Sequence, residues 1–260
     1  MGKIRDKFRQ LKESGKSAFI PYITFGFPDM ETFSRTAVSL DECGADFIEI
    51  GFPFSDPIAD GPVIQHSSRI ALDKGADLPG FYSWLKEYKR RIKAPLILMC
   101  YYNSVYSLGV NKFLKKFSGF LDGIIIPDLL AEEGEEFVSL SGKYNIDTVF
   151  FVTPTTENKR LPLINKCSTG FIYYISVTGV TGIRRDISLN TLSDLKRIRK
   201  VSSSPVCIGF GVSTRGQVKS LKKDFDGVIV GSAIIKKIGG LYKQKDFIQR
   251  FKEFILWLNA

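Results

Sequence analysis

Histidine is nearly absent from this chain of 260 residues, which contains only His66. Protein zinc sites usually combine several His or Cys side chains at short, regular spacings. The four cysteines stand far apart in the sequence with no CxxC pair, so they indicate neither a metal site nor a disulfide framework. We therefore expect no metal, and we expect His66 to be a surface or packing residue. Unpaired cysteines also fit a reducing cytoplasm.

Long apolar runs are missing as well. No run of about 18 apolar residues occurs, so the sequence predicts no membrane-spanning helix. The N-terminal stretch MGKIRDKFRQLKESGK is charged and amphipathic, and it lacks the apolar core of a signal peptide. Both observations favour a cytoplasmic protein that does not bind a membrane.

Acidic residues are outnumbered, with 27 Asp and Glu against 37 Lys and Arg and a net charge of +10. Such a balance raises the possibility of nucleic-acid binding. The basic residues, however, are spread over several helix-like segments, and neither an aromatic RNA-binding strand nor a helix-turn-helix pattern accompanies them. We interpret them as solvated helix faces that also attract anionic metabolites, and we expect no nucleic-acid partner.

The dominant pattern along the chain is a short apolar run followed by an amphipathic segment. Eight runs read as strands: Ala18 to Phe25, Phe47 to Ile50, Leu96 to Met99, Gly123 to Ile126, Thr148 to Val152, Phe171 to Ser176, Val206 to Gly209 and Val228 to Val230. The runs are continuously apolar rather than alternating, as expected for parallel strands covered on both faces. Each is followed by a predicted helix, and one extra amphipathic helix, Met1 to Gly15, precedes the first strand.

Eight strand–helix units in a chain of this length predict an α/β fold, a closed (β/α)₈ or TIM barrel. One predicted helix has Asp29 as its N-cap, runs through Cys43 and ends at Gly44. The others are Pro62 to Lys74, Leu78 to Lys93, Val110 to Phe117, Glu132 to Lys143, Asn158 to Cys167, Leu189 to Lys200, Arg215 to Lys223 and Phe247 to Leu258. A doubly wound open sheet is the alternative, but it normally carries GxGxxG after its first strand, and residues 23–28 do not. No linker interrupts the pattern, so we expect a single domain over residues 1–260.

The stretch FIEIGFPFSDPIADGP, residues 47–62, places three acids on a strand end and a proline-rich loop. Ile48 and Ile50 have the opposite parity to Glu49, which directs Glu49 into the mouth of the barrel. A buried carboxyl group there has a raised pKa and can act as general acid and base, unless it is a salt-bridged structural residue. Asp60 is either a second functional acid or the N-cap of the next helix, and Asp56 orders the loop or contacts a partner.

Glycine-rich turns after the last two predicted strands indicate an anion site. Gly209-Phe210-Gly211-Val212-Ser213 and Gly231-Ser232-Ala233 lie where barrels of this kind commonly bind phosphate, and the second turn opens a short helix. The alternative is that these glycines serve only turn packing. The loop VTGVTGIRRD, residues 177–186, has two glycines and two arginines, and we expect it to be a lid.

Several motifs, spread in order over most of the chain, closely resemble the tryptophan synthase α subunit family. They are Pro21-Tyr22-Ile23-Thr24 with Gly26 and Pro28, Glu49 to Pro57, Ala59 to Gln65, Pro127-Asp128-Leu129, Gly179-Val180-Thr181-Gly182, Gly209 to Ser213, and Gly231 to Ile234. The block PFSDPxADGP is highly specific for this family.

The resemblance implies a cofactor-independent lyase that cleaves indole-3-glycerol phosphate to indole and glyceraldehyde 3-phosphate in a retro-aldol reaction. Glu49 would protonate indole C3 and later take the glycerol hydroxyl proton, and Asp60 would accept the indole N–H and stabilise the indolenine-like intermediate. Matching substrate-binding positions are Tyr22, Tyr173, Thr181, Gly182, Phe210, Gly211, Gly231 and Ser232. Family members pair with a pyridoxal-phosphate β subunit as an αββα heterotetramer, and Pro53, Asp56 and Pro57 match part of that interface.

Other functions stay open on the sequence alone. The chain could be another phosphate-binding barrel, such as a sugar-phosphate isomerase. It could also be a catalytically weak barrel that acts mainly as the activating partner of a β subunit.

Overall fold

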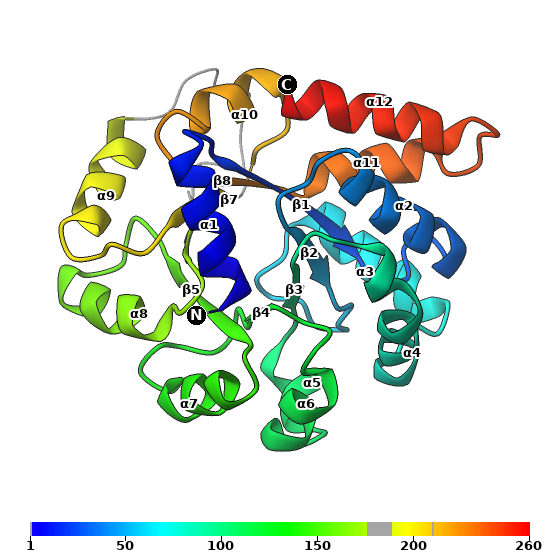
Figure 1. Ribbon diagram of the computed structural model, residues 1–260. Helices are drawn as coiled ribbons and strands as arrows, with labels where there is room; N and C mark the ends of the chain where they lie inside the picture. Colours follow the sequence, from blue (N-terminus) through cyan, green and yellow to red (C-terminus); the bar gives the residue numbers. More distant parts are fainter. Residues whose placement is uncertain (1, 176–188, 210) are drawn as a thin grey trace.

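The computed structural model describes residues 2–175, 189–209 and 211–260, and it contains a closed barrel of eight parallel strands (Figure 1). The strands are β1 (Ala18–Thr24), β2 (Ile48–Gly51), β3 (Leu96–Met99), β4 (Gly123–Ile125), β5 (Asp147–Val152), β6 (Ile172–Ile175), β7 (Val206–Gly209) and β8 (Gly227–Val230). They pair in sequence order, and β8 closes the barrel against β1. The predicted TIM barrel is confirmed, and the ends of every predicted strand lie within two residues of the ends of the corresponding observed strand.

Helices surround the barrel. They are α1 (Lys3–Glu13), α2 (Met30–Glu42), α3 (Pro62–Asp73), α4 (Leu78–Tyr88), α5 (Tyr102–Tyr106), α6 (Val110–Phe117), α7 (Glu135–Lys143), α8 (Leu161–Cys167), α9 (Leu189–Arg199), α10 (Arg215–Leu221), α11 (Ser232–Leu241) and α12 (Phe247–Asn259), with short 3₁₀ turns η1 (Lys89–Arg91) and η2 (Asn158–Arg160). Asp29 caps α2 by accepting the N–H of Thr32 at 2.7 Å, as predicted, and Gly44 ends it with φ +79°.

Three helix predictions differ from the structure. The helix predicted from Glu132 begins at Glu135, because residues 130–134 form turns in which Glu133 N–H donates to the carbonyl of Leu130. The segments predicted as Leu78 to Lys93 and Asn158 to Cys167 each include a 3₁₀ turn, η1 or η2. The short helix α5 was not predicted, because five residues carry too little periodicity to reveal a helix.

Successive residues of each strand alternate between two apolar layers. Ile48 and Ile50 lie in the layer between the strands and the helices, whereas Phe47 and Ile97 lie in the barrel interior. Glu49 therefore lies on the interior side of β2, as its position between the two isoleucines predicts. This alternation determines which side chains of the strand ends reach the mouth of the barrel.

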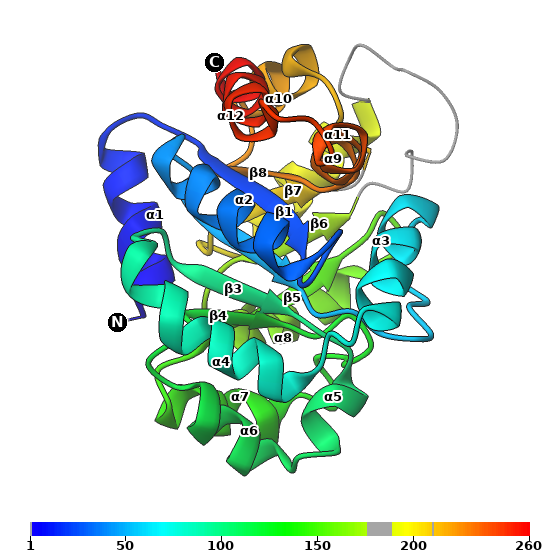
Figure 2. The same ribbon diagram turned by 90° about the vertical axis from the view of Figure 1, so that its right-hand side faces the viewer.

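The N-terminal end of the barrel is closed by α1, at the opposite end from α3 and α5 (Figure 2). Ile4, Phe8 and Leu11 of this helix pack into the barrel interior.

Around these apolar residues, acids at the starts of the strands accept backbone N–H groups of the preceding strand: Asp46 from Phe19, Asp122 from Leu96 and Asp226 from Val206. Lys3 and Lys7 of α1 pair with Asp122 and Asp46. A binding site must therefore open at the other end.

None of the helices in the described part of the chain is both long enough and apolar enough to cross a membrane.

Candidate active site

Glu49 lies at the carboxyl end of β2, where its backbone is in register with Tyr22 of β1 and Ile97 of β3. The residue is 1% exposed, and its Oε2 atom has no hydrogen-bond partner in the part of the chain that the structure describes. Burial and, to a lesser degree, the nearby charge of Asp60 raise the pKa of Glu49 from 4.5 to about 8. Among the described residues it forms no salt bridge, so no ion pair in that part of the chain accounts for its burial. With its pKa near 8, the Glu49 carboxyl group is largely protonated at neutral pH.

Asp60 lies in the loop after β2, partly buried beside Tyr101. The Tyr101 hydroxyl donates to Asp60 Oδ2 at 3.3 Å and accepts the N–H of Ala59 at 2.9 Å. Burial raises the pKa of Asp60 to about 6, and the hydrogen bond from Tyr101 limits the rise. The N-cap of α3 is Gly61, without a side-chain hydrogen bond, so the alternative of Asp60 as an N-cap is wrong. A second acid therefore lies in the barrel mouth.

Tyr101 was not singled out from the sequence. It lies two residues beyond Met99, the last residue of β3. The loops that follow the strands are where barrel sites are usually built. This position just after a barrel strand is the signal that could have identified Tyr101 from the sequence.

Two tyrosines, Tyr22 on β1 and Tyr173 on β6, pack over glycines of the neighbouring strands β2 and β7. A Cβ atom on Gly51 would lie 1.9 Å from the Tyr22 hydroxyl, and one on Gly209 would lie 2.2 Å from the Tyr173 hydroxyl. Only glycine permits these close approaches. Burial raises the pKa of both phenols, and the charge of Glu49 contributes to each shift. The predicted residues Tyr22, Glu49 and Tyr173 are thus brought together in the barrel mouth.

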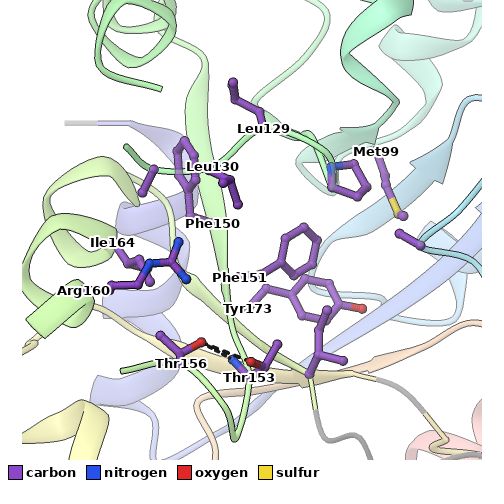
Figure 3. Close-up of a pocket in the computed structure, with 14 residues that line it drawn as sticks. Met99, Leu129, Leu130, Phe150, Phe151, Thr153, Thr156, Arg160, Ile164 and Tyr173 are labelled. Atoms are coloured by element: carbon purple, nitrogen blue, oxygen red, sulfur yellow. Dashed lines mark hydrogen bonds between the residues drawn. The ribbon is translucent and has the colours of Figure 1, made fainter. Parts of the chain in front are cut away.

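A cavity of about 250 Å³ opens beside this group (Figure 3). Its walls near the barrel mouth are Ala59, Met99, Pro127, Phe151 and Tyr173. The Phe151 and Tyr173 rings lie 5.0 Å apart between centroids, and Ala59 is the neighbour of Asp60. The space next to the acids is therefore apolar and aromatic, which suits a flat, uncharged ring.

Glycines lie at the ends of β7 and β8, where we predicted an anion site. Gly211 has φ +73°, and Gly231 is the N-cap of α11, whose first residue is Ser232. The N–H groups of Ile234 and Ile235 donate to the carbonyl of Gly231, which leaves those of Ser232 and Ala233 at the start of the helix to bind an anion. Thr181, Gly182, Phe210 and the expected lid over residues 177–186 lie outside the described residues.

The three residues predicted to contact a partner differ in exposure. Pro53 is buried, Pro57 is half-buried, and Asp56 is exposed with its Oδ2 accepting the Ser55 hydroxyl at 2.5 Å. The same loop carries Ile58, which is 83% exposed. His66 is exposed on α3, as expected for a surface residue.

Metal chemistry has no evident ligand set in the part of the chain that the structure describes, since no group of three or more His, Cys, Asp or Glu could hold an ion there. All four cysteines are buried and free.

Known proteins resemble this chain along its whole length. The family model for the tryptophan synthase alpha chain matches residues 8–257. The tryptophan synthase alpha chain of Thermoanaerobacter sp. (strain X514) is 41% identical over 256 residues, covering 98% of this chain and 97% of that protein. The one from Picosynechococcus sp. is 39% identical over 263 residues, covering 98% and 100%.

Solved structures give the same result. A tryptophan synthase complex from Pyrococcus furiosus contains a chain with a TM-score of 0.84 and 37% identity, covering 94% of this chain and 98% of that chain. A protein from Aquifex aeolicus VF5 has a TM-score of 0.89 and 34% identity, covering 100% and 98%. On this sequence and structural similarity, which extends to nearly every residue, the chain belongs to the tryptophan synthase alpha chain family.

Proposed function

We propose that Glu49 and Asp60 carry out the cleavage of indole-3-glycerol phosphate to indole and glyceraldehyde 3-phosphate in this chain. This reaction is that of tryptophan synthase alpha chains, so the chain is a carbon–carbon lyase of tryptophan biosynthesis. The burial of Glu49 carries its assignment: the residue is 1% exposed, its Oε2 atom has no partner among the described residues, and its pKa is raised to about 8. It is a proton donor held ready in an apolar site.

Breaking the bond between indole C3 and the glycerol chain requires that C3 first become tetrahedral. Glu49 donates its proton to C3, and the ring nitrogen takes up the positive charge of the resulting indolenine-like intermediate. The carboxylate of Glu49 then removes the proton from the glycerol hydroxyl group next to C3. The carbon–carbon bond breaks, its electron pair returns to the ring, and the glycerol fragment leaves as an aldehyde. Glu49 ends the cycle protonated, so no external acid or base is consumed.

Asp60 supplies the negative charge that this scheme needs opposite the positive ring nitrogen. Its pKa of about 6 leaves it largely ionised at neutral pH, while that of Glu49 leaves Glu49 largely protonated. Two carboxyl groups in different protonation states are typical of sites that use one as an acid and the other as an electrostatic stabiliser. We assign to the Asp60 carboxylate the hydrogen bond from the indole N–H, which strengthens as the nitrogen becomes positive.

The remaining predicted contacts belong to the ends of the substrate. Tyr22 and Tyr173 form apolar walls for the indole ring. Gly211 after β7, and Gly231 and Ser232 with backbone N–H groups at the start of α11, bind the phosphate group. We assign Gly182, Phe210 and Thr181 to the same substrate through their family positions.

A β subunit is the partner that we propose, in an αββα heterotetramer. The similar chain from Pyrococcus furiosus comes from a tryptophan synthase complex. Apolar side chains from two loops and from α5 at the mouth end are exposed, namely Ile58 at 83%, Leu130 at 52% and Tyr106 at 69%. Together with Asp56 and Pro57 they offer a surface that a partner would cover. For Pro53, which is buried, we propose a supporting role in this loop. The free cysteines suit our proposal of a cytoplasmic location.

The test is indole release from indole-3-glycerol phosphate by the purified chain, with and without a β subunit. We expect Glu49→Gln to lower kcat by at least about 10³-fold and Asp60→Asn by at least about 10²-fold. Glu13→Gln, a change of the same type at an exposed position of α1, should retain full activity.

Full activity of Glu49→Gln would remove the role assigned to Glu49. Wild-type protein without activity in both assays would instead favour a chain that only activates its partner. Release of a different product from a panel of sugar phosphates would favour another phosphate-binding barrel.

A further inference from the structure

The cavity beside the acids is a single space, and part of its wall lies beyond the residues of the barrel mouth. We call this part of the cavity the outer lobe, and its walls are Leu130, Ala131, Phe150, Thr156, Arg160 and Ile164. Phe150 and Phe151 are neighbours on β5 with opposite parity, so Phe150 belongs to the layer under the helices and Phe151 to the barrel interior. Both line the same cavity, which therefore passes over the end of β5 (Figure 3).

The polar groups of the outer lobe already have partners. Arg160 forms two hydrogen bonds with Glu132, at 2.5 and 2.8 Å. The Thr156 hydroxyl oxygen accepts the N–H of Thr153 at 2.9 Å and lies 3.1 Å from the Thr153 hydroxyl. A ligand group that entered the lobe would find few unpaired donors or acceptors and would lie mainly against Leu130, Phe150 and Ile164. The lobe therefore favours a neutral, apolar group.

The position of the outer lobe relative to the acids fixes which part of a ligand would reach it. Asp60 and Glu49 are assigned to the nitrogen and C3 of an indole ring, so the benzene half of the ring must extend away from them. On the side of β1, Tyr22 already fills the space against Gly51 and lies next to Gly231. The open direction runs past Tyr173 and Phe151 toward the outer lobe.

We propose that the outer lobe binds an apolar substituent on the benzene ring of an indole ligand. The inference rests on the proposed function for the orientation of the ring, and it extends the ligands of this chain to ring-alkylated indoles and their glycerol phosphates. Each methylene group moved from water into such an apolar space strengthens binding about fourfold. An ethyl group that fits the lobe should therefore strengthen binding by about tenfold.

The experiment measures the affinity of indole and of 4-, 5-, 6- and 7-ethylindole for the purified full chain by calorimetry or NMR titration. We expect at least one ethylindole to bind about tenfold more tightly than indole. Ile164→Phe enlarges a buried side chain that lines the lobe and should abolish this preference. Ala131→Val is the second filling variant, with a smaller added volume. Ile198→Phe, at a fully buried position that does not line the cavity, is the matched control and should keep the preference.

Unfolding temperatures show whether the variants retain the fold. Ile164→Phe fills empty space and should unfold no earlier than wild type, whereas Ile198→Phe overpacks a filled core and should unfold earlier. Equal or weaker binding of all four ethylindoles, or an unchanged preference in both filling variants, overturns the proposal. Cleavage of indole-3-glycerol phosphate is assayed separately, so a failure of the proposed function is seen there and not in the titration.

Discussion

The hydroxyl group of Tyr101 joins two neighbouring residues of the loop after β2: it donates to Asp60 at 3.3 Å and accepts the N–H of Ala59 at 2.9 Å. The ring of Phe54 stacks on Tyr101 with centroids 4.9 Å apart. One side chain at the end of β3 therefore holds the loop that carries the acid, and it also influences the protonation of that acid.

Removing this hydroxyl group should move the acidic limb of the pH–activity profile to higher pH. The Tyr101 hydrogen bond lowers the pKa of Asp60, so Tyr101→Phe raises that pKa above about 6. Because the proposed role needs the ionised carboxylate, activity is then lost at a higher pH as the solution is acidified. The measurement is kcat/KM between pH 5 and 9. Tyr106→Phe, exposed at the same end, is the control, and superimposable Tyr101→Phe and wild-type profiles would refute the coupling.

The wild-type profile itself should be bell-shaped. The proposed reaction needs Asp60 ionised, which requires a pH above about 6, and Glu49 protonated, which requires a pH below about 8. Activity should therefore be highest near neutral pH and fall on both sides. Asp60→Asn should retain a basic limb but lose the acidic one in its residual activity. A rate that stays constant from pH 7 to 10 would contradict protonated Glu49 as the reacting form.

Glu49 should also make the protein less stable at alkaline pH. Its pKa is raised in the folded state, so its stability contribution is fully present below the ordinary pKa of 4.5 and is lost as the pH rises through about 8. Glu49→Gln has no charge to bury, so it should be more stable than wild type at pH 9, on the order of a few kcal/mol, with a much smaller difference at pH 4.5. Urea unfolding at the two pH values measures this, and an equal difference at both would be evidence against a buried titrating carboxyl group.

The sequence predicted those features that depend on local periodicity or on the rules of the barrel. Strand parity placed Glu49 in the interior, because side chains alternate strictly along a strand. The link between Ala59 and Tyr101 could not be predicted, because it joins residues 42 positions apart through a loop without a repeating pattern. For the same reason the burial of Pro53 and the late start of α7 were not foreseen. Loop conformation depends on tertiary contacts that composition does not encode.

The acids at the closed end of the barrel should matter for stability and not for the reaction. Asp122 is 5% exposed, accepts the N–H of Leu96 at 2.9 Å, and lies 3.0 Å from the ammonium groups of both Lys3 and Lys89. Asp122→Ala leaves these donors unpaired and should cost about 2–4 kcal/mol of unfolding free energy, with kcat retained in the folded protein.

The control for Asp122 is Asp73→Ala, which breaks an ion pair with Arg69 in which both side chains are more than half exposed. That change should cost less than about 1 kcal/mol. Denaturant unfolding of both variants measures the loss of unfolding free energy. Equal losses would show that Asp122 stabilises the fold no more than an exposed acid does.

Gly51 and Gly209 should be needed for substrate binding because each lies directly under a tyrosine ring of the site. A Cβ atom would lie 1.9 Å from the Tyr22 hydroxyl at Gly51 and 2.2 Å from the Tyr173 hydroxyl at Gly209. Either alanine variant must therefore shift its tyrosine, and we expect KM for indole-3-glycerol phosphate to rise about tenfold or more, with about 1–3 kcal/mol of lost stability. Gly142→Ala supplies the comparison, since a Cβ atom there would meet nothing within 4 Å among the described residues beyond its chain neighbours and its own helix backbone, and the site is an exposed turn of α7. That variant should be as stable as wild type or up to about 1 kcal/mol more stable, because alanine favours the helix.

If Gly51→Ala and Gly209→Ala keep the wild-type KM, the two rings are not walls of the substrate site, and the assignment of Tyr22 and Tyr173 must be withdrawn.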